Sequence, residues 1–144
     1  MEVKKVTTKE ELEQAFQLRI DVFVHEQGVP LDDEFDVFDT LEAECDHLLV
    51  FYEGEAIGTG RLRIVEGIGK LERIVVHKNF RLFGVGKLIV QSLEQLAKQR
   101  GLTQVKLHGQ THAEGFYQGL GYQAASDVFL EDGIEHLLMI KEIA

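Results

Sequence analysis

A short glycine-containing stretch between a strand-like and a helix-like segment constrains the fold of this chain more than any other feature. The stretch RLFGVGK, residues 81–87, follows the apolar run LERIVVH and precedes LIVQSLEQLAKQR, in which apolar residues recur at helical spacing. A strand that passes through a glycine-rich loop into a helix leaves the first N–H groups of the helix free, at the positive end of its dipole. Such a turn can bind phosphate without requiring a basic protein.

Periodicity and turn signals along the rest of the chain predict an α/β (α+β) fold with a mixed, mostly antiparallel twisted sheet and helices on both faces. The expected order is β-α-β-β-β-α-β-α-β-β. The expected strands are residues 2–7, 48–52, 56–65, 70–77, 104–108, 122–130 and 134–143. Helices are expected over about 8–24 and 88–100, and a short one from 111 to either Gly119 or Gly121. At 144 residues, we expect one domain that covers 1–144.

Local signals indicate where several of these elements begin and end. Thr-x-x-Glu capping boxes at 8–11 and 111–114 predict the starts of two helices. Gly101 lies where the end of the middle helix requires a left-handed residue. Asp132-Gly133 predicts a type I′ turn between the last two strands, since both residues tolerate a positive φ.

Charge and cysteine content restrict the partners and the compartment. The formal charge of −10 argues against nucleic acid or an anionic membrane as a partner. Many of the acids lie in residues 32–46, which we expect to be a solvated loop; the alternative is a surface that attracts a cationic or amine substrate. The single Cys45, the lack of an apolar signal core and the lack of a bilayer-length apolar run predict a cytoplasmic protein.

The loop at 81–87 does not match the common nucleotide-binding patterns. A Walker A loop has a glycine where this chain has Arg81, and a serine or threonine where it has Leu88. A dinucleotide fingerprint requires glycine or alanine where the chain has Ile89. The pattern that does fit is Arg/Gln-x-x-Gly-x-Gly/Ala, and in this the chain resembles the GNAT superfamily of acyl-CoA-dependent N-acetyltransferases.

The resemblance covers nearly the whole chain, and it implies the GNAT fold and acetyl-CoA as the acyl donor. In that family the loop amides hold the pyrophosphate of coenzyme A, and the preceding strand pairs with the pantetheine arm. The residues that the resemblance assigns to these two roles are Ile74, Val75, Val76, Arg81, Phe83, Gly84, Val85, Gly86 and Lys87. The alternative is a glycine-rich turn that binds nothing.

The later stretch HGQTHAEGFYQGLGY, residues 108–122, matches a second pattern of the superfamily. The family shows a polar residue at a strand end, an alanine three positions on, a tyrosine four further on, and a Leu-Gly-aromatic ending. Gln110, Ala113 and Tyr117 occupy the first three positions here, followed by 120–122. Gln110 replaces the more usual asparagine but keeps the amide. The resemblance implies that Gln110, Ala113 and Phe116 contact the cofactor.

Tyr117 is the expected catalytic acid. Attack of an amine on a thioester expels a thiolate, and a phenol with a reference pKa of about 10 can protonate or hydrogen-bond a thiolate whose acid has a pKa of about 8.5. The alternative is that Phe116 and Tyr117 are both core aromatics on a short helix.

The attacking amine must be neutral, so a general base or a water relay is required. Glu72 is the expected base, with the alternative that it pairs with Arg73 or Arg61. Strict strand alternation would place Glu72 on one face with Ile74 and Val76, and Arg73, Val75 and His77 on the other. His108 and His136 are further candidates, with a structural role as the alternative for each. No Cys or His spacing supports a zinc site, so we expect no metal.

A narrower resemblance links both ends of the chain to bacterial acetyltransferases described as ElaA-like or YjcF-like. The matching positions are Arg19, Val22, Phe23, Val24, Glu26, Gln27, Val29 and Pro30 near the start, and Glu131, Gly133, Ile134, His136 and Met139 near the end. Glu135 departs from the proline that the subgroup often has there. A fainter similarity to acyl-homoserine lactone synthases, which are longer, is not favoured.

In the superfamily these two ends wall the acceptor pocket, so the resemblance implies that Arg19, Glu26, Gln27 and His136 contact the acceptor, with His108 beside them. The alternative for Arg19 and Glu26 is a buried ion pair with each other. The predicted activity is transfer of acetyl from acetyl-CoA to a primary amine of a small molecule or peptide, by direct attack in a ternary complex. The alternative is a non-catalytic acyl-CoA-binding sensor or regulatory module. Dimers are common in this fold, so a homodimer is an open expectation.

Overall fold

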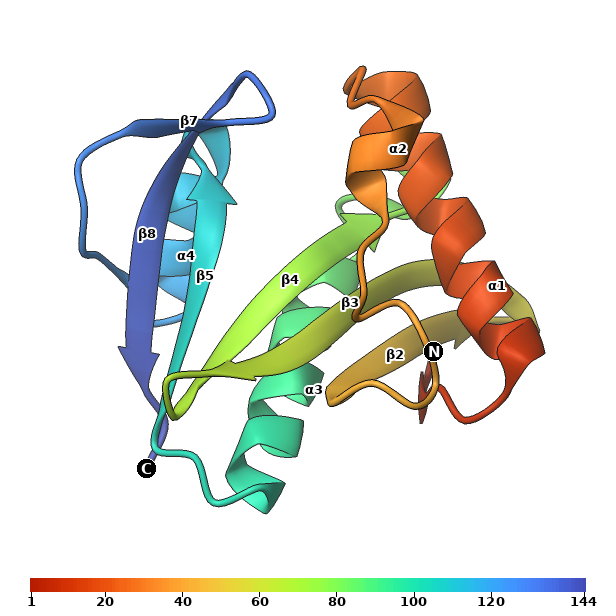
Figure 1. Ribbon diagram of the computed structural model, residues 1–144, viewed down its shortest axis with the longest axis horizontal. Helices are drawn as coiled ribbons and strands as arrows, with labels where there is room; N and C mark the ends of the chain where they lie inside the picture. Colours follow the sequence, from red (N-terminus) through yellow and green to blue (C-terminus); the bar gives the residue numbers. More distant parts are fainter.

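A computed structural model describes residues 1–144 as a twisted eight-stranded sheet with helices on both faces (Figure 1). The elements in chain order are β1 (Glu2–Lys5), α1 (Lys9–Arg19), the π-helical segment η1 (Ile20–Glu26), α2 (Leu31–Glu34), β2 (Cys45–Tyr52), β3 (Glu55–Val65), β4 (Ile68–Val76), η2 (Lys78–Phe80), α3 (Val85–Gln99), β5 (Gln104–Gln110), η3 (Thr111–Ala113), α4 (Glu114–Gly119), β6 (Gln123–Ala124), β7 (Phe129–Glu131) and β8 (Ile134–Glu142).

The strands lie in the order β1-β2-β3-β4-β5-β8-β6, and β7 also pairs with β8. Every pair is antiparallel except β4 with β5. This confirms the mixed, mostly antiparallel sheet. None of the helices combines the length and the apolar character that crossing a bilayer requires.

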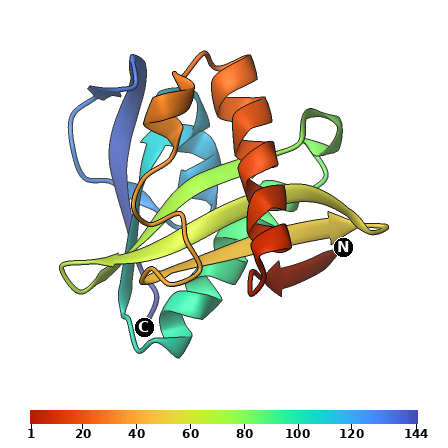
Figure 2. The same ribbon diagram turned by 45° about the vertical axis from the view of Figure 1, so that its right-hand side comes forward.

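Two apolar cores lie on opposite faces of the sheet, because successive strand residues point to opposite sides. Leu48 and Val50 of β2 pack in the core under α3, whereas Leu49 between them packs in the core under α1. Figure 2 shows α1 crossing the face opposite to α3. Both Leu48 and Leu49 are almost fully buried, and each such side chain contributes roughly 1.5–3 kcal/mol of transfer free energy.

Strands β4 and β5 pair only at their first residues and then separate. Gly69–Leu71 is in register with Val105–Leu107, and no pairing between the two strands follows. Figure 1 shows the two strands diverging, with β1 to β4 on one side of the opening and β5 to β8 on the other. The second half of β4, residues 72–76, therefore has no strand partner on its β5 side.

A β-bulge in β4 accompanies this divergence. Thr59 pairs with Val75 and Arg61 with Glu72, so β4 uses one residue more than β3 over the same span, and Arg73 has a φ of +55°. Beyond the bulge, each side chain of β4 points to the side of the sheet opposite to the one that uninterrupted alternation would give.

The predicted alternation in this strand is accordingly wrong. Ile74 and Val76 pack against the core under α3, while Val75 belongs to the core under α1. Glu72 follows Leu71, which points into the core under α3, and so it lies on the α1 side. Glu72 does not share a face with Ile74 and Val76, because the extra residue of the bulge shifts the alternation of side-chain directions by one position.

Several predicted ends are confirmed. Thr8 and Glu11 form the reciprocal capping box at the start of α1. Gly101, after α3, has a φ of +78°. Asp132 and Gly133 have φ values of +53° and +74°, as a type I′ turn requires.

Other predicted boundaries are wrong. The second capping box does not form, because the N–H of Glu114 bonds to the carbonyl of Thr111 and Thr111 already lies within a 3₁₀ turn. The predicted strand at 122–130 is broken into β6 and β7. Between them the Ala125 N–H bonds to the Leu138 carbonyl, and the hydroxyl of Ser126 accepts the Leu138 N–H at 2.9 Å.

The acidic segment at 32–46 is tied to the sheet, so the expectation of a solvated loop is wrong for its central acids. Arg19, only 1% exposed, holds Glu34 at 2.9 Å and Asp39 at 2.6 Å. Arg61, also 1% exposed, binds Asp39 at 2.9 Å and Asp36 at 2.7 Å. Because these side chains satisfy Arg19, the alternative of an Arg19–Glu26 ion pair is also wrong.

Candidate functional site

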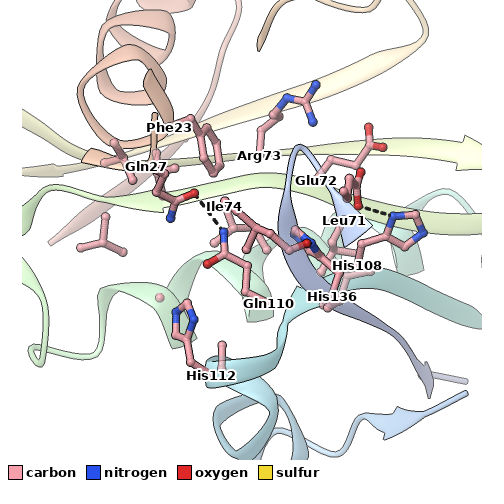
Figure 3. A pocket seen from close by; sticks show the side chains of 18 of the residues that line it. Phe23, Gln27, Leu71, Glu72, Arg73, Ile74, His108, Gln110, His112 and His136 are labelled. Carbon is pink, nitrogen blue, oxygen red and sulfur yellow. Dashed lines mark hydrogen bonds and ion pairs between the residues drawn. The ribbon is translucent and has the colours of Figure 1, made fainter. Parts of the chain in front are cut away.

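The separation of β4 and β5 leaves a cleft of about 600 Å³, walled by η1, the loop after β4, α4 and the β7–β8 hairpin (Figure 3). Most of the residues predicted for a site line it together: Glu26, Gln27, Glu72, Ile74, Val75, Val76, Arg81, Gly86, His108, Gln110, Ala113, Phe116, Tyr117 and His136. Phe83, Gly84, Val85 and Lys87 belong to the loop and helix start beside it. Arg19 does not line the cleft and is buried in its ion pairs.

The loop before α3 reverses the chain with two left-handed residues. Leu82 has a φ of +73° and Gly84, the N-cap of α3, has a φ of +78°. No side chain caps the helix, so its first N–H groups have no side-chain acceptor. Buried Val85 anchors the helix start in the core, while Leu82 and Phe83 are exposed.

Arg81 fastens this loop to both walls of the cleft. Its Nε donates to the carbonyl of Val76 at 3.2 Å, and its guanidinium lies 2.9 Å from the carboxylate of Glu26. The hydrogen bond and the charge of Arg81 lower the pKa of Glu26, against the opposing effect of burial. The end of η1 and the end of β4 are thereby joined at the start of the loop.

The N-terminus of α3 faces the start of α4. A Cβ at Gly86 would lie 3.4 Å from the ring of Phe116. The Phe116 ring in turn lies edge-on to Tyr117, with 5.0 Å between centroids. Phe116 therefore packs between the start of α3 and Tyr117.

Tyr117 rests against β5 at a glycine. A Cβ at Gly109 would lie 3.1 Å from the Tyr117 ring, so the ring occupies the space that any larger residue would fill. Tyr117 also packs edge-on to Tyr122 and against the core under α3. Burial raises the pKa of Tyr117 to about 12, and its phenol is therefore neutral at physiological pH.

Glu72 lies among three cations instead of facing the cleft alone. Its carboxylate is 3.0 Å from Arg61, 2.8 Å from Arg63 and 2.9 Å from Lys70. Burial raises the pKa of Glu72, but these cations outweigh burial and hold it well below its usual range. The pairing with Arg61, one of the two partners considered above, is present, and a carboxylate so stabilised has little tendency to take a proton.

Two amides meet across the mouth of the cleft. Gln110, at the end of β5, donates through Nε2 to Oε1 of Gln27 at 3.0 Å. Figure 3 shows the two side chains reaching toward each other beside Ile74, with Phe23 above them in this view.

Two histidines lie on the opposite side of the cleft, beside Leu71 and Glu72 (Figure 3). His108 Nδ1 lies 2.9 Å from a carboxylate oxygen of Glu131, and His136 Nδ1 lies 2.7 Å from the carbonyl oxygen of Ile134. The Phe129 ring contacts both imidazoles. From the sequence alone, no role was assigned to Glu131. The signal available for it was its position directly before the predicted Asp132-Gly133 turn, in a hairpin whose second strand carries His136.

Comparison with protein families and known sequences identifies relatives across the whole chain. The family model described as acetyltransferase (GNAT) domain matches residues 6–143. The uncharacterized protein YyaT of Bacillus subtilis is 54% identical over 144 residues, which is 100% of this chain and 97% of that protein. The uncharacterized N-acetyltransferase YjcF of the same organism is 43% identical over 135 residues, covering 93% of this chain and 94% of that protein.

Solved structures give the same picture. An acyl-CoA N-acyltransferase from Pseudomonas aeruginosa is 31% identical with a TM-score of 0.87, and the match covers 98% of this chain and 99% of that one. Escherichia coli ElaA is 28% identical with a TM-score of 0.86 at the same coverage of 98% and 99%. An aminoglycoside 6'-N-acetyltransferase solved with coenzyme A shares the fold at 16% identity, with a TM-score of 0.81 over 99% of this chain and 97% of that one.

Proposed function

Because this chain belongs to the GNAT acetyltransferase domain family, among its YjcF-like and ElaA-like members, we propose that it transfers acetyl from acetyl-CoA to a primary amine by direct attack in a ternary complex. The observation that carries the proposal is the meeting of two sequence-distant motifs, 81–87 and 110–117, in one cleft where β4 leaves β5. The acceptor is the amine of a small molecule or a peptide.

The residues of the cleft fit an extended acyl-CoA. The uncapped N-terminus of α3, with Gly84 and Gly86, offers backbone N–H groups and the helix dipole to a pyrophosphate. The unpaired second half of β4 offers its backbone to the amide-containing pantetheine arm in the manner of an added strand. Phe116, Ala113 and Ile74 supply apolar surface along the way.

Acetyl-CoA, when bound, supplies a thioester with an electrophilic acyl carbon and a thiol leaving group. Tyr117 holds its proton throughout the working pH range, since burial raises its pKa to about 12. Full proton transfer from this phenol to a thiolate with an acid pKa of about 8.5 would be uphill by several pKa units, each about 1.4 kcal/mol. Tyr117 therefore acts as a neutral hydrogen-bond donor to the charge that develops on sulfur.

A Tyr117→Phe variant separates an enzyme from a non-catalytic acyl-CoA-binding module. The phenyl ring keeps the packing against Gly109 and removes only the hydroxyl donor. We expect CoA affinity, measured by calorimetry, to stay within about twofold, while amine-dependent release of free thiol from acetyl-CoA falls roughly tenfold or more. Tyr52→Phe, at an exposed tyrosine outside the cleft, is the matched control and should change neither quantity.

The alternatives predict other outcomes. A sensor or regulatory module would bind CoA and release no thiol with any amine, in the unmodified protein as in the variant. An anion-binding scaffold unrelated to CoA would show no CoA affinity in the calorimeter.

A further inference from the structure

One wall of the cleft carries a histidine and a carboxylate that are held together by a hairpin. His108 lies on β5, and Glu131 is the last residue of β7, before the type I′ turn into β8. The 2.9 Å contact joins Nδ1 of His108 to a carboxylate oxygen of Glu131. The Phe129 ring meets the imidazole edge-on at 5.1 Å between centroids. The ring is thus fixed on two sides.

This contact determines the tautomer of His108. His108 lowers the pKa of Glu131, first through this hydrogen bond, so the Glu131 side chain is an acceptor-only carboxylate. Nδ1 must then carry the proton, and in the neutral ring Nε2 holds a lone pair. A carboxylate at Nδ1 also stabilises the imidazolium that forms when Nε2 takes a proton.

His108 and Tyr117 lie on opposite sides of the sheet at the gap. Leu107 points into the core under α3, and Tyr117 packs at Gly109, which is on the same face two residues on. His108, between them, faces the α1 side. A group in the gap between β4 and β5 would therefore have the phenol on one side and the imidazole on the other.

The neighbouring groups are less suited to take a proton. Glu72 is held ionised by Arg61, Arg63 and Lys70. His136 makes its hydrogen bond to a backbone carbonyl, and Glu131 acts on it only through space, without a direct contact. The titratable and charged groups that surround the pair from β4, β8 and the hairpin are Lys70, Glu72, His136 and Asp132.

We propose that His108 is the general base of the reaction and that Glu131 positions and charges it for this role; this rests on the proposed acetyl transfer. As the amine nitrogen forms its bond to the acyl carbon, His108 Nε2 takes the proton that the nitrogen loses. The C–S bond breaks and its electron pair leaves with sulfur, which Tyr117 hydrogen-bonds and which then takes a proton from water. His108 returns its proton to solvent, so the amide and a free thiol are the net products.

The test is the pH profile of thiol release from acetyl-CoA with the best substrate among butylamine, 1,4-diaminobutane, benzylamine and glycinamide. If none of these amines is acetylated, the slow hydrolysis of acetyl-CoA is followed instead, because the same base would serve attacking water. We expect His108→Asn to lower kcat/KM roughly 100-fold or more and to remove the acid limb of the profile. In His108→Ala, added imidazole should restore part of the rate, an effect that a purely structural histidine would not give.

Glu131→Gln keeps a hydrogen-bonding side chain and removes its charge. The acid limb should move to lower pH in this variant, because the imidazolium loses its counter-charge, and the rate should fall less than in His108→Asn. His25→Gln, at an exposed histidine outside the cleft, is the matched control and should leave the profile unchanged.

A second readout does not depend on turnover. Nitrogen-15 NMR of the imidazoles in the whole protein should show neutral His108 protonated at Nδ1. Protonation at Nε2, or an acid limb that survives His108→Asn and vanishes in His136→Gln, would overturn the assignment of the base while leaving acetyl transfer intact. Absence of any thiol release with intact CoA binding would instead refute the proposed activity.

Discussion

At the residue scale, the proposed chemistry depends on how closely Tyr117 approaches β5. Its ring fills the space over Gly109, where a Cβ would come within 3.1 Å of Cδ2 and 3.2 Å of Cε2. Real Cβ atoms rarely make such contacts, and neighbouring aromatic side chains in a close-packed core have little room to retreat. The position of the Tyr117 hydroxyl therefore depends on residue 109 being a glycine, which has no Cβ to displace the ring.

Gly109→Ala tests this positioning. The added methyl should push the Tyr117 ring outward, lowering the rate of thiol release about tenfold or more while CoA affinity changes little. The matched control is Gly115→Ala, since a Cβ there meets nothing within 4 Å and the residue lies in α4. Equal rates for the two alanine variants would contradict the proposed role of the Tyr117 hydroxyl.

Single residues were predictable where the backbone alone decides the outcome. Gly101 and Asp132-Gly133 take the positive φ values that their turns require. Arg73 takes a φ of +55° for which its residue type gives no signal, because the ion pair with Glu34 and the neighbouring strand hold it there. The partners of Arg19, 15 and 20 residues along the chain, likewise depend on tertiary contacts that no local pattern contains.

At the scale of elements, the loop and α3 behave as one unit that presents backbone N–H groups to the cleft. Two glycines in it serve different purposes. Gly84 is needed for the left-handed turn, with a φ of +78°. Gly86 lies within the first turn of α3, where a Cβ would make an ordinary 3.4 Å contact with Phe116.

Alanine at these two glycines should therefore give opposite results. Gly84→Ala should lower the free energy of unfolding by about 1–2 kcal/mol, because the new side chain is strained at this φ. Gly86→Ala should leave stability unchanged or raise it by up to about 1 kcal/mol, as expected for alanine in a helix. It should nevertheless weaken CoA binding roughly tenfold, since the methyl covers the N–H groups of the loop.

Urea unfolding and calorimetry of the same two proteins check this prediction. If CoA binds Gly86→Ala as tightly as the unmodified chain, the pyrophosphate does not lie over the start of α3.

Regular elements were predictable where one periodicity persists. The capping box of α1 and the apolar spacing of α3 are examples of such local signals. The bulge in β4 and the break between β6 and β7 were not, because each is set by the register of pairing with another strand and leaves no mark in the periodicity of the segment itself. Simple alternation therefore places Glu72 and Ile74 on the same face, which the structure does not.

At the scale of the whole molecule, buried ion pairs join the acidic segment, α1 and the centre of the sheet. Asp39 forms ion pairs with both Arg19 and Arg61, and Arg61 also forms an ion pair with Glu72 of β4. Removing one member would leave a buried charge unpaired, which typically costs about 3–5 kcal/mol. The acidic composition is visible in the sequence, but the internal arginines that bind these acids could be located only in the folded chain.

Acid should weaken the fold through these carboxylates. Burial raises the pKa of Asp39, but hydrogen bonds and charges, chiefly from Arg19, outweigh it and lower the pKa to about 2. A depressed folded-state pKa gives stability that is present above the unfolded value of about 3.9 and lost as pH falls through the folded value. Glu34, whose pKa burial raises, acts in the opposite direction. We expect the free energy of unfolding to fall between about pH 4 and pH 2, by about 2 kcal/mol from Asp39 alone.

Asp39→Asn isolates this contribution. The variant should be less stable than the unmodified chain at pH 7, and the difference in urea-unfolding free energy should shrink by about 2 kcal/mol as pH falls from 5 to 2. A difference that stays constant over this range would show that the arginine partners do not lower the pKa of Asp39 in the folded chain.

Amide hydrogen exchange with and without acetyl-CoA tests the central claim most directly, because it does not require the acceptor to be known. The claim is that residues 74–76 of β4 and 84–87 at the start of α3 form one acyl-CoA site. We expect slower exchange in both segments when acetyl-CoA is added, with the acidic segment at 32–46 unchanged. Protection confined to one of the two segments, or found only in the acidic segment, would contradict the claim.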